Sequence, residues 1–304
     1  MYRNSRYLLL FSVLFLALGF SNCVVAQPGN QEVNHPEKKQ KKKKAKKVKL
    51  PDIDLSHWKV TLPIANEEGK PYEIEPPEIL DFADHDIAKP YMYIDSAAGA
   101  IVFHAMPTSS TTRNTKYSRC ELREQMMPGS NSTNWTFADG GNLKARIAME
   151  SCSRASDGKY HKTIILQIHG RLTNEQRDLI GEDDNNAPPI LKIYWDNGKI
   201  RIKSKVLANP NASDEALLHE DAWDNDLGYT FPTEVGFGKF TLEVQVSEGK
   251  MVVILNNLEY KVYQDLTMER WGIFENYFKA GNYFQTRDEG AHSKVKFYKL
   301  EISH

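Results

Sequence analysis

Several features on which common classes of enzyme depend are missing from this 304-residue sequence. It contains no glycine-rich phosphate loop, no Gly-x-Ser-x-Gly elbow and no metal ligands at a recognisable spacing. No pair of acidic residues stands out as the two carboxylates of a glycosidase. We therefore expect chemistry that needs no cofactor and no catalytic metal.

Long apolar runs are also scarce. The most apolar one, Leu8–Phe20, follows two arginines and is too short to span a membrane comfortably. Small residues follow it, which predicts a signal peptide over residues 1–26 that is cut after Ala26. A second reading makes Cys23 a lipidated N-terminus. Under either reading the protein leaves the cytoplasm and is secreted, periplasmic or attached to the cell surface.

Charge is unevenly distributed behind a formal total of −1. Nine lysines and no acidic residue lie between Lys38 and Lys49, within a stretch, 27–50, that has no apolar periodicity. Such a block repels itself, so we interpret 27–50 as a solvated linker, or else as a tether to an anionic surface. From Pro51 onward there are 28 Lys and Arg against 38 Asp and Glu. A body this acidic is no general nucleic-acid binder, and a polyanion would need locally gathered basic residues.

The remainder, residues 51–304, has the pattern of one all-β domain. Its apolar residues alternate in short runs separated by turn residues, and no long stretch shows a helical stripe. Asp196-Asn197-Gly198 is typical of a hairpin, and Ser213–His219 predicts a short helix capped by Ser213. The expected strands are Trp58–Leu62, Ala100–Ala105, Asn142–Met149, Thr163–His169, Ile190–Trp195, Lys199–Val206, Lys239–Val246, Met251–Leu255 and Val295–Ile302.

Two cysteines lie inside this domain, Cys120 and Cys152. Export would permit a disulfide between them. The alternative is a pair of buried thiols that act as small apolar side chains, and the sequence leaves both open.

Three segments place polar side chains on one face of an apparent strand. In the first, alternation puts Arg119, Glu121 and Arg123 on one face, where two guanidiniums suit the binding of carboxylates. In the second, Gln167 and His169 share a face, which combines an amide donor with a side chain suited to proton transfer near neutral pH.

The third segment runs from Tyr277 to Gln285. Its polar face carries Tyr277, Lys279, Tyr283 and Gln285, and Gly281 would let a ligand or a neighbouring backbone approach closely. Each segment alone is compatible with an ordinary surface strand. Together they provide anion-binding groups, a base and an acid, which is what removal of the C5 proton of a uronate and expulsion of its C4 oxygen require.

These segments resemble the signature blocks of the alginate lyases of polysaccharide lyase family 7. The family blocks are Arg-x-Glu-Leu-Arg, Gln-Ile-His or Gln-Val-His, and Tyr-x-Lys-Ala-Gly-x-Tyr-x-Gln, and all three occur here in that order. The resemblance extends over about residues 52–304; Cys120 is a mild departure, since Ser or Thr is usual there. It implies a β-jelly-roll sandwich of two antiparallel sheets with a concave cleft, which acts on alginate. We expect a monomer, although the sequence does not determine the oligomeric state.

The resemblance also implies a role for each site residue. Gln167 and Arg119 or Arg123 would hold the uronate carboxylate, and Tyr283 would protonate the leaving oxygen. His169 would remove the C5 proton of guluronate, or help to neutralise the carboxylate of mannuronate. For mannuronate Tyr283 would also act as the base, provided that nearby cations lower its pKa. The substrate-binding residues would be Glu121, Tyr277, Lys279 and Gln285.

Ile168, between the glutamine and the histidine, is associated in this family with guluronate or mixed blocks. Two rival functions remain: a lyase for another polyuronate such as glucuronan, and a non-catalytic polyuronate-binding module. Endo or exo action depends on loops, for which Thr108–Lys116 and Arg171–Ala187 are candidate lids.

Overall fold

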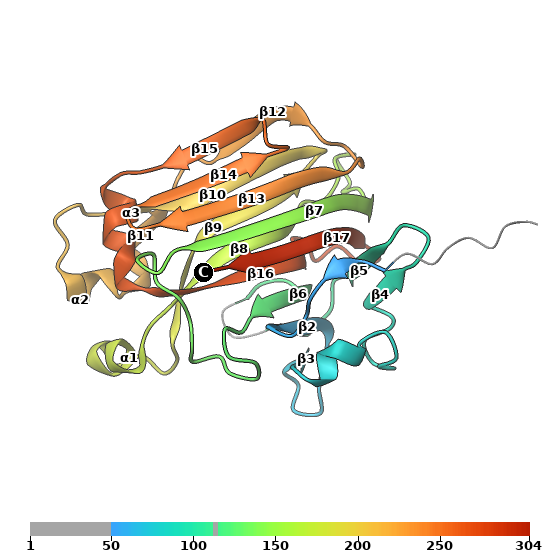
Figure 1. Cartoon of the computed structure of the whole chain (residues 1–304), viewed down its shortest axis with the longest axis horizontal. Coiled ribbons are helices and arrows are strands. Elements are labelled where there is room, and N and C mark those ends of the chain that lie inside the picture. Colours follow the sequence, from blue (N-terminus) through green and yellow to red (C-terminus); the bar gives the residue numbers. More distant parts are fainter. Residues whose placement is uncertain (1–49, 112–114) are drawn as a thin grey trace, which may run out of the picture. The chain divides into compact units, whose positions relative to one another are not determined.

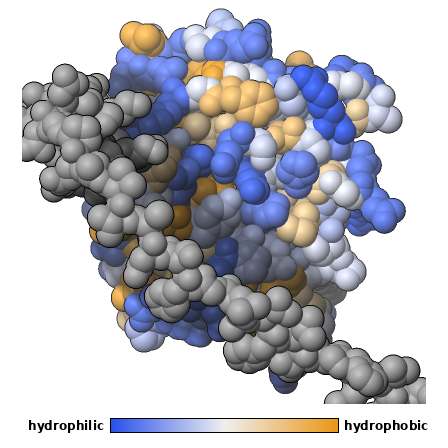
Figure 2. All heavy atoms as spheres, turned by 90° about the vertical axis from the view of Figure 1, so that its right-hand side faces the viewer, coloured by the Kyte–Doolittle hydropathy of each residue, from blue (hydrophilic) through white to orange (hydrophobic). Residues whose placement is uncertain are grey.

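The computed structural model describes residues 50–111 and 115–304. The predicted signal peptide, the lysine block and Cys23 lie outside these ranges, and the candidate lid Thr108–Lys116 lies partly outside them. In the described ranges no helix has the length and apolar composition needed to cross a bilayer. Polar residues predominate on the face seen in Figure 2, with apolar residues scattered among them.

The described chain forms two sheets that lie in two layers, with β13 and β14 in front of β9 and β10 in Figure 1. The first sheet has the order β15 (Glu259–Tyr263), β14 (Lys250–Leu255), β13 (Phe240–Ser247), β7 (Gly141–Cys152), β17 (Ser293–Ser303), β5 (Ala100–Ala105) and β4 (Met92–Asp95). Its eighth strand, β1 (Asp52–Ile53), pairs with β17 and is parallel to it.

The second sheet has the order β11 (Trp223–Asn225), β10 (Lys199–Leu207), β9 (Asn186–Asp196), β8 (Thr163–Arg171), β16 (Glu275–Phe284), β6 (Arg119–Glu124), β2 (Trp58–Ala65) and β3 (Pro71–Ile74). A ninth strand, β12 (Tyr229–Glu234), pairs with β10. Pairing within this sheet is antiparallel. All nine predicted strands are present; β6 contains the first polar segment, and β16 contains the third except for Gln285.

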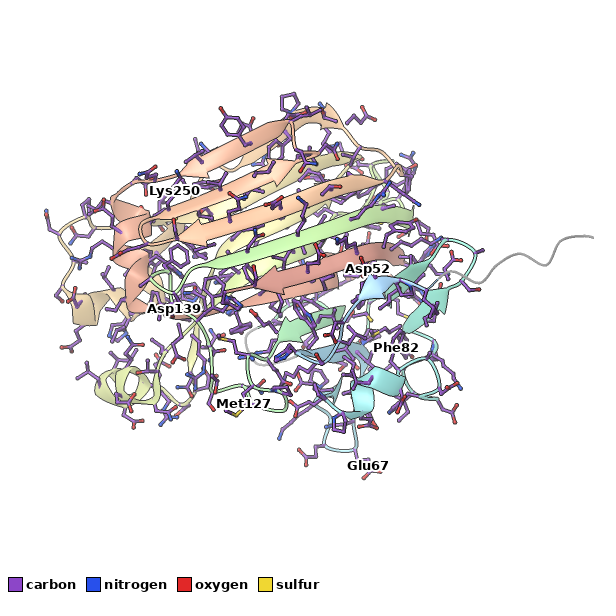
Figure 3. All side chains as sticks on the ribbon, viewed as in Figure 1. Asp52, Glu67, Phe82, Met127, Asp139 and Lys250 are labelled. Atoms are coloured by element: carbon purple, nitrogen blue, oxygen red, sulfur yellow. The ribbon has the colours of Figure 1, made fainter. Side chains whose placement is uncertain are left out.

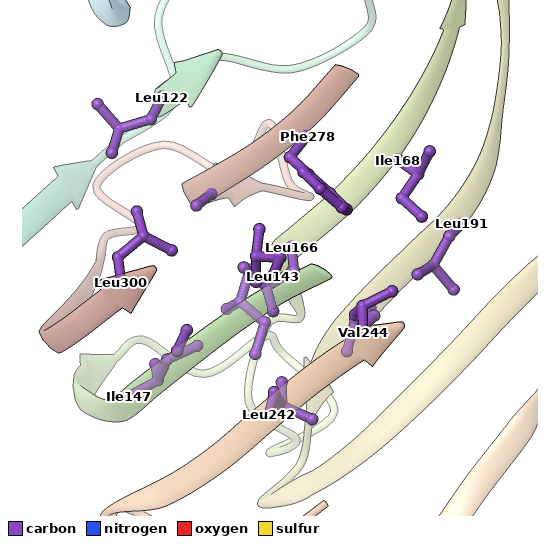
Figure 4. Packing of buried hydrophobic residues seen from close by; sticks show 14 of the residues in the cluster. Leu122, Leu143, Ile147, Leu166, Ile168, Leu191, Leu242, Val244, Phe278 and Leu300 are labelled. Atoms are coloured by element: carbon purple, nitrogen blue, oxygen red, sulfur yellow. The ribbon is translucent and has the colours of Figure 1, made fainter. Parts of the chain in front are cut away.

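The core lies between the sheets, because alternate side chains of each strand point inward. Leu166 and Ile168 of β8 and Leu242 and Val244 of β13 are almost completely buried and belong to one cluster (Figure 4). Burial of a side chain of this size contributes about 1.5–3 kcal/mol. Burial of the inward-facing side chains of each strand therefore determines which side chains lie on the outer face of the sheet.

The turn between β9 and β10 is the predicted hairpin. Asp196 pairs with Lys199, and Asn197 and Gly198 have φ angles of 51° and 83°. Positive φ at both central positions is the conformation that matches the twist of the flanking strands, and asparagine and glycine adopt it readily.

Helices are short and lie outside the sheets. The predicted helix is present as α2 (Asp214–Leu217), with the Ser213 side chain accepting from Ala216 N–H. The sequence patterns did not predict α1 (Asn174–Ile180), α3 (Leu266–Arg270) or the 3-10 turns η1 (Glu78–Asp81), η2 (Glu220–Ala222) and η3 (Trp271–Ile273). In these short segments the capping residues, not an apolar stripe, set the boundaries.

The candidate lid Arg171–Ala187 is therefore not a plain loop. It contains α1, which begins with a reciprocal capping box between Thr173 and Gln176 and ends at Gly181 in the left-handed conformation. Gln176 also donates to the carbonyl of Ile273, which ties this helix to η3.

Candidate active site

A cavity of about 890 Å³ lies over the middle strands of the second sheet. Seven of the nine predicted site residues line it: Arg119, Arg123, Gln167, His169, Tyr277, Lys279 and Tyr283. Strand alternation accounts for this gathering, because the intervening residues Cys120, Leu122 and Ile168 are fully buried in the core.

Cross-strand pairing arranges polar residues of the cavity in one row. Lys192 of β9 is paired with Gln167 of β8, which is paired with Lys279 of β16. Lys279 is paired with Arg123 of β6, and Arg123 with Lys59 of β2. Neighbouring strands are roughly 4.8 Å apart. The row therefore presents four cations and one amide across five strands.

Glu121 lies beneath this row and is 1% exposed. It does not line the cavity, so the expectation that it contacts substrate is wrong for this structure. One carboxylate oxygen accepts from Gln167 Nε2 at 2.6 Å, and the other is 2.6 Å from Lys279 Nζ and 3.7 Å from Arg119 Nη1. A buried carboxylate with three such partners fixes their positions, and removing it would leave uncompensated charge.

Lys279 is almost fully buried, and burial disfavours its charged form. Burial lowers the pKa of Lys279 to about 8, although the charge of Glu121 acts in the opposite direction. Lys279 is therefore a cation at neutral pH that loses its proton at mildly alkaline pH.

His169 is held so that one ring nitrogen can accept a proton. Its Nδ1 lies 3.0 Å from the carbonyl oxygen of Gly170, which can only accept, so Nδ1 carries the hydrogen and Nε2 has a lone pair. Burial first, and then the charge of Lys279, lower the pKa of His169 to about 3. The ring is neutral throughout the ordinary working range of pH.

Tyr283, in contrast to His169, retains a proton that it can donate. Burial raises its pKa, and the charge of Arg119, whose guanidinium lies 5.0 Å from the ring centre, only partly offsets this effect. The lowered pKa that a role as the base for mannuronate would require is therefore not found at Tyr283. Its hydroxyl keeps its proton and can donate it.

Arg123 and Tyr277 form the wall behind His169. The Arg123 guanidinium donates to Asn131 O and Asn134 Oδ1, at 3.0 and 2.9 Å, and lies 4.1 Å from the centre of the Tyr277 ring. The Tyr277 ring also stacks nearly parallel on the His169 ring, with centroids 5.3 Å apart. Both residues therefore orient His169 as well as lining the cavity.

Gln285 lies apart from this group and does not line the cavity. Its side chain donates to the carbonyl of Tyr283 at 3.1 Å, beyond an irregularity in the pairing of β16 with β8. The sequence predicted that a ligand or a neighbouring backbone lies close to Gly281, and the structure places the backbone of β6 there. A Cβ there would lie 2.7 Å from Cys120 O, and its φ of 142° is itself unfavourable for other residues.

Further lining residues were not predicted as site residues. They include Lys59, Lys192 and Arg171, the loop residues Gly129–Ser132, and Asp184–Asn186 at the start of β9. Lys59 and Lys192 each stand alone in a strand of otherwise ordinary pattern, so only strand pairing reveals that they join the row. Arg171 lies 2.5 Å from Glu275 and thereby links the ends of β8 and β16.

The described residues contain no group of three His, Cys, Asp or Glu side chains placed to hold a metal ion. The site instead combines fixed cations and an amide with a neutral imidazole and a protonated phenol. Such a set can bind a carboxylate, accept a proton at His169 and donate one at Tyr283.

Residues 53–304 match the family model described as alginate lyase. Among curated proteins, an alginate lyase of Klebsiella pneumoniae is 23% identical over 83% of this chain and 90% of its own length. The fold is that of the family 7 alginate lyase A1-II′, and this agreement confirms the expected β-jelly-roll.

Two crystal structures of A1-II′ show the similarity. A tyrosine-to-phenylalanine variant in complex with product (GGG) is 28% identical, with a TM-score of 0.66, over 83% of this chain and 97% of that one. A variant that also has a histidine-to-asparagine change, in complex with substrate (GGMG), is 27% identical, with a TM-score of 0.65, over 83% and 94% of the chains.

Proposed function

Because this chain belongs to the alginate lyase family, and is thus a polysaccharide lyase, we propose that it cleaves the 1,4-glycosidic bonds of alginate by β-elimination. The products would be two chains, one of which begins with a C4–C5 unsaturated uronate. The observation that carries this mechanism is that one cavity is lined by both His169 and Tyr283, with His169 Nδ1 held 3.0 Å from the Gly170 carbonyl so that its Nε2 can accept a proton. Burial lowers the pKa of His169 and raises that of Tyr283, which suits the first to accept a proton and the second to donate one.

The first step is recognition of the uronate carboxylate. Gln167 can donate one amide hydrogen to Glu121 and its other to the substrate, while Arg119 and Lys279 supply positive charge. As C5 loses its proton, negative charge spreads onto this carboxylate. Donors already fixed by Glu121 stabilise that charge without having to reorganise.

Proton transfer completes the reaction. His169 Nε2 takes the C5 proton, the electron pair of the C–H bond forms the C4–C5 double bond, and the C4–O bond breaks. Tyr283 gives its proton to the departing oxygen and regains one as His169 releases its own to solvent. In support, A1-II′ is seen with bound oligosaccharide in variants that change a tyrosine, or a tyrosine and a histidine.

We propose further that guluronate-containing chains are the preferred substrate. Ile168 separates Gln167 from His169 and is fully buried, so any influence on the substrate passes through those two neighbours. The relative A1-II′ has bound substrate and product described as GGMG and GGG.

Export is also a proposal, in which residues 1–26 are removed and the enzyme meets its polymer outside the cytoplasm, as a monomer. Sequencing the N-terminus of protein recovered from the producing cells tests the cleavage after Ala26. An intact N-terminus, or a lipid on Cys23, would contradict that site. Light scattering of the purified protein tests the monomer.

The deciding experiment follows ultraviolet absorbance after addition of the protein to polyguluronate, polymannuronate and glucuronan. We expect absorbance to rise on alginate blocks, faster on polyguluronate, and to be almost abolished in Tyr283→Phe and His169→Ala. A rise on glucuronan alone would assign a different substrate. Retention of alginate without any rise would leave a binding module.

A further inference from the structure

The segment that leads into β6 lies against Tyr283. Arg119, the first residue of β6, is paired with Tyr283 of β16, so the residues before Arg119 continue past the end of that pairing. The rings of Tyr117 and Tyr283 have centroids 6.4 Å apart and an interplanar angle of 60°. Thr115 lines the cavity together with Tyr283. Residues 115–117 therefore border the side of the cavity on which Tyr283 lies.

The backbone of this segment contacts the Tyr283 hydroxyl. Burial raises the pKa of Tyr283, and the charge of Arg119 lowers it. Hydrogen bonds from the backbone of Lys116 and Tyr117 lower this pKa further. A hydrogen bond lowers the pKa of a phenol when the phenol oxygen accepts it, because the bond then favours the phenolate. The backbone donor is N–H, so the oxygen accepts from two N–H groups and its own hydrogen is left for the substrate.

Side chains outside the cavity anchor the same segment. At its β6 end, the Ser118 hydroxyl donates to the carbonyl of Met106. On its outer side, Arg287 Nε donates to the carbonyl of Lys116 at 3.1 Å, and the Arg287 guanidinium lies 6.0 Å from the centre of the Tyr117 ring. Arg287 is exposed and does not line the cavity. Its contacts are therefore with the segment and not with the space where a substrate would bind.

Arg287 and Tyr283 meet opposite edges of one peptide group. The carbonyl of Lys116 and the N–H of Tyr117 belong to the same planar unit, and in a trans peptide they point in opposite directions. Arg287 holds the carbonyl edge, while the N–H edge donates to Tyr283. A hydrogen bond to a carbonyl also polarises its peptide group, which strengthens the N–H as a donor.

We propose that the N–H groups of Lys116 and Tyr117 form an anion site for the phenolate that Tyr283 becomes during the reaction, and that Arg287 is the positioning residue of this site. The assignment rests on the proposed function. In that reaction the O–H bond of Tyr283 breaks, its proton goes to the departing oxygen, and the electron pair stays on the phenol oxygen. Negative charge thus develops where two fixed donors already point, which lowers the barrier without reorganisation.

Loss of this arrangement should act on the chemical step. Arg287→Met leaves the residues that hold the uronate carboxylate unchanged, so kcat should fall about three- to tenfold while KM stays within about twofold. An ester in place of the peptide bond between Lys116 and Tyr117 removes one donor and no side chain, and should lower kcat about tenfold or more. A role of Arg287 in folding alone predicts a lower melting temperature without this division between kcat and KM.

Two variants serve as controls. Arg154 is also exposed, also donates to a backbone carbonyl, that of Gly158, and also lies over a tyrosine ring, that of Tyr160. Arg154→Met thus loses a matched pair of contacts away from the cavity lining. Lys250, which begins β14 of the first sheet and is labelled in Figure 3, controls for the loss of a positive charge. Arg154→Met and Lys250→Met should both stay within about twofold of the unmodified protein in kcat and KM.

A titration separates this inference from the proposed function. A fluorotyrosine in place of Tyr283 has a more acidic hydroxyl than tyrosine, and its fluorine NMR signal reports the pKa of that hydroxyl whether or not cleavage occurs. Arg287→Met should raise this pKa, with a proton dissociation constant about three- to tenfold smaller, and Arg154→Met should not change it.

An unchanged pKa in Arg287→Met would overturn the anion site even if alginate is cleaved. So would full kcat in the ester variant, or a fall in kcat that Arg154→Met shares. A raised pKa in a protein that cleaves no polyuronate would keep the anion site and reject the lyase.

Discussion

Burial shifts the pKa values of three residues that line the cavity. Because burial disfavours charge, it keeps His169 neutral, keeps Tyr283 protonated and brings the pKa of Lys279 down to about 8. A base and an acid therefore coexist at the same pH. Burial widens the pH range in which both forms are present, because an exposed histidine would become protonated below its ordinary pKa of about 6.5.

The pH dependence of kcat/KM should report these values. The neutral form of His169 persists down to about pH 3, so we expect no acidic limb at the ordinary pKa of histidine. As pH rises past about 8, Lys279 loses its charge and carboxylate binding weakens, so kcat/KM should fall. Initial rates over a wide pH range measure both limbs. Activity that halves near the usual histidine pKa would contradict the burial of His169.

Glu121 should set the position of the alkaline limb. Its charge raises the pKa of Lys279, so Glu121→Gln should move the limb to lower pH and reduce activity at neutral pH. Breaking a buried ion pair costs about 3–5 kcal/mol, so the variant should also unfold at lower temperature. The control is Glu150→Gln, which should change neither property, because Glu150 is exposed and pairs with Lys296 on the first sheet, away from the cavity lining.

At the scale of elements, prolines in β9 influence the geometry around the base. Pro188 and Pro189 lack the N–H that a strand normally donates, and the pairing of β8 with β9 shifts register on both sides of His169. Such irregularities redirect side chains next to functional sites. β9 begins at Asn186, before the expected start at Ile190, and so includes two prolines, which are unfavourable in the middle of a sheet.

A second arrangement at this scale joins β6, β16 and the last residue. His304 Nε2 is 2.6 Å from Glu124 Oε1, while the other oxygen of Glu124 accepts from Trp135 Nε1 at 3.0 Å and from the N–H of Phe278 at 2.8 Å. Glu124 is 1% exposed and directly follows Arg123 in the site. This contact therefore supports the two strands that carry the first and third polar segments.

The His304 contact should stabilise the protein in a pH-dependent way. Burial opposes its charge, but the hydrogen bond and charge of Glu124 outweigh burial and raise the pKa of His304. A raised pKa adds stability at low pH that is lost as pH rises through the folded-state value. His304→Ala should lower the free energy of unfolding by about 1–2 kcal/mol at mildly acidic pH and by less in alkali.

Denaturant unfolding at two pH values measures this difference. The control is His292→Ala, because His292 is exposed and its hydrogen bond to Ser153 Oγ uses only the backbone N–H. An equal loss of stability at both pH values would show that packing of the His304 ring, and not its charge, provides the support.

At the scale of the molecule, the domain is held by its two-layer core without a covalent link. Cys120 and Cys152 are free and buried, which resolves the two sequence alternatives in favour of thiols. Burial raises the pKa of Cys152 to about 12 and raises that of Cys120 as well. Both groups are therefore poor nucleophiles.

Reducing agent should leave the folded domain unchanged. We expect the same melting temperature with and without dithiothreitol, because no disulfide contributes to stability. A thiol reagent should label Cys120 and Cys152 only after unfolding. A melting temperature that falls on reduction would reveal a disulfide, and with it a different packing of β6 and β7. Differential scanning calorimetry and mass spectrometry provide the two measurements.

The sequence by itself determined which side chains each strand presents. Period-two alternation placed Arg119 with Arg123, Gln167 with His169, and Tyr277 with Lys279, and it assigned Cys120 and Ile168 to the core. These are local consequences of strand geometry, so no knowledge of the partners was needed. The hairpin at Asn197-Gly198 and the cap at Ser213 were determined in the same local way.

Only the tertiary structure decided how those faces meet. Register places Lys192 beside Gln167 and Lys59 beside Arg123, although many residues separate the members of each pair. It also places Glu121 beneath the row, where it positions other groups, and leaves Gln285 outside the cavity. Burial, which sets the pKa of His169 and Tyr283, is likewise a property of the assembled sheets. Pairing and burial depend on residues distant in the chain, and for that reason no local pattern could specify them.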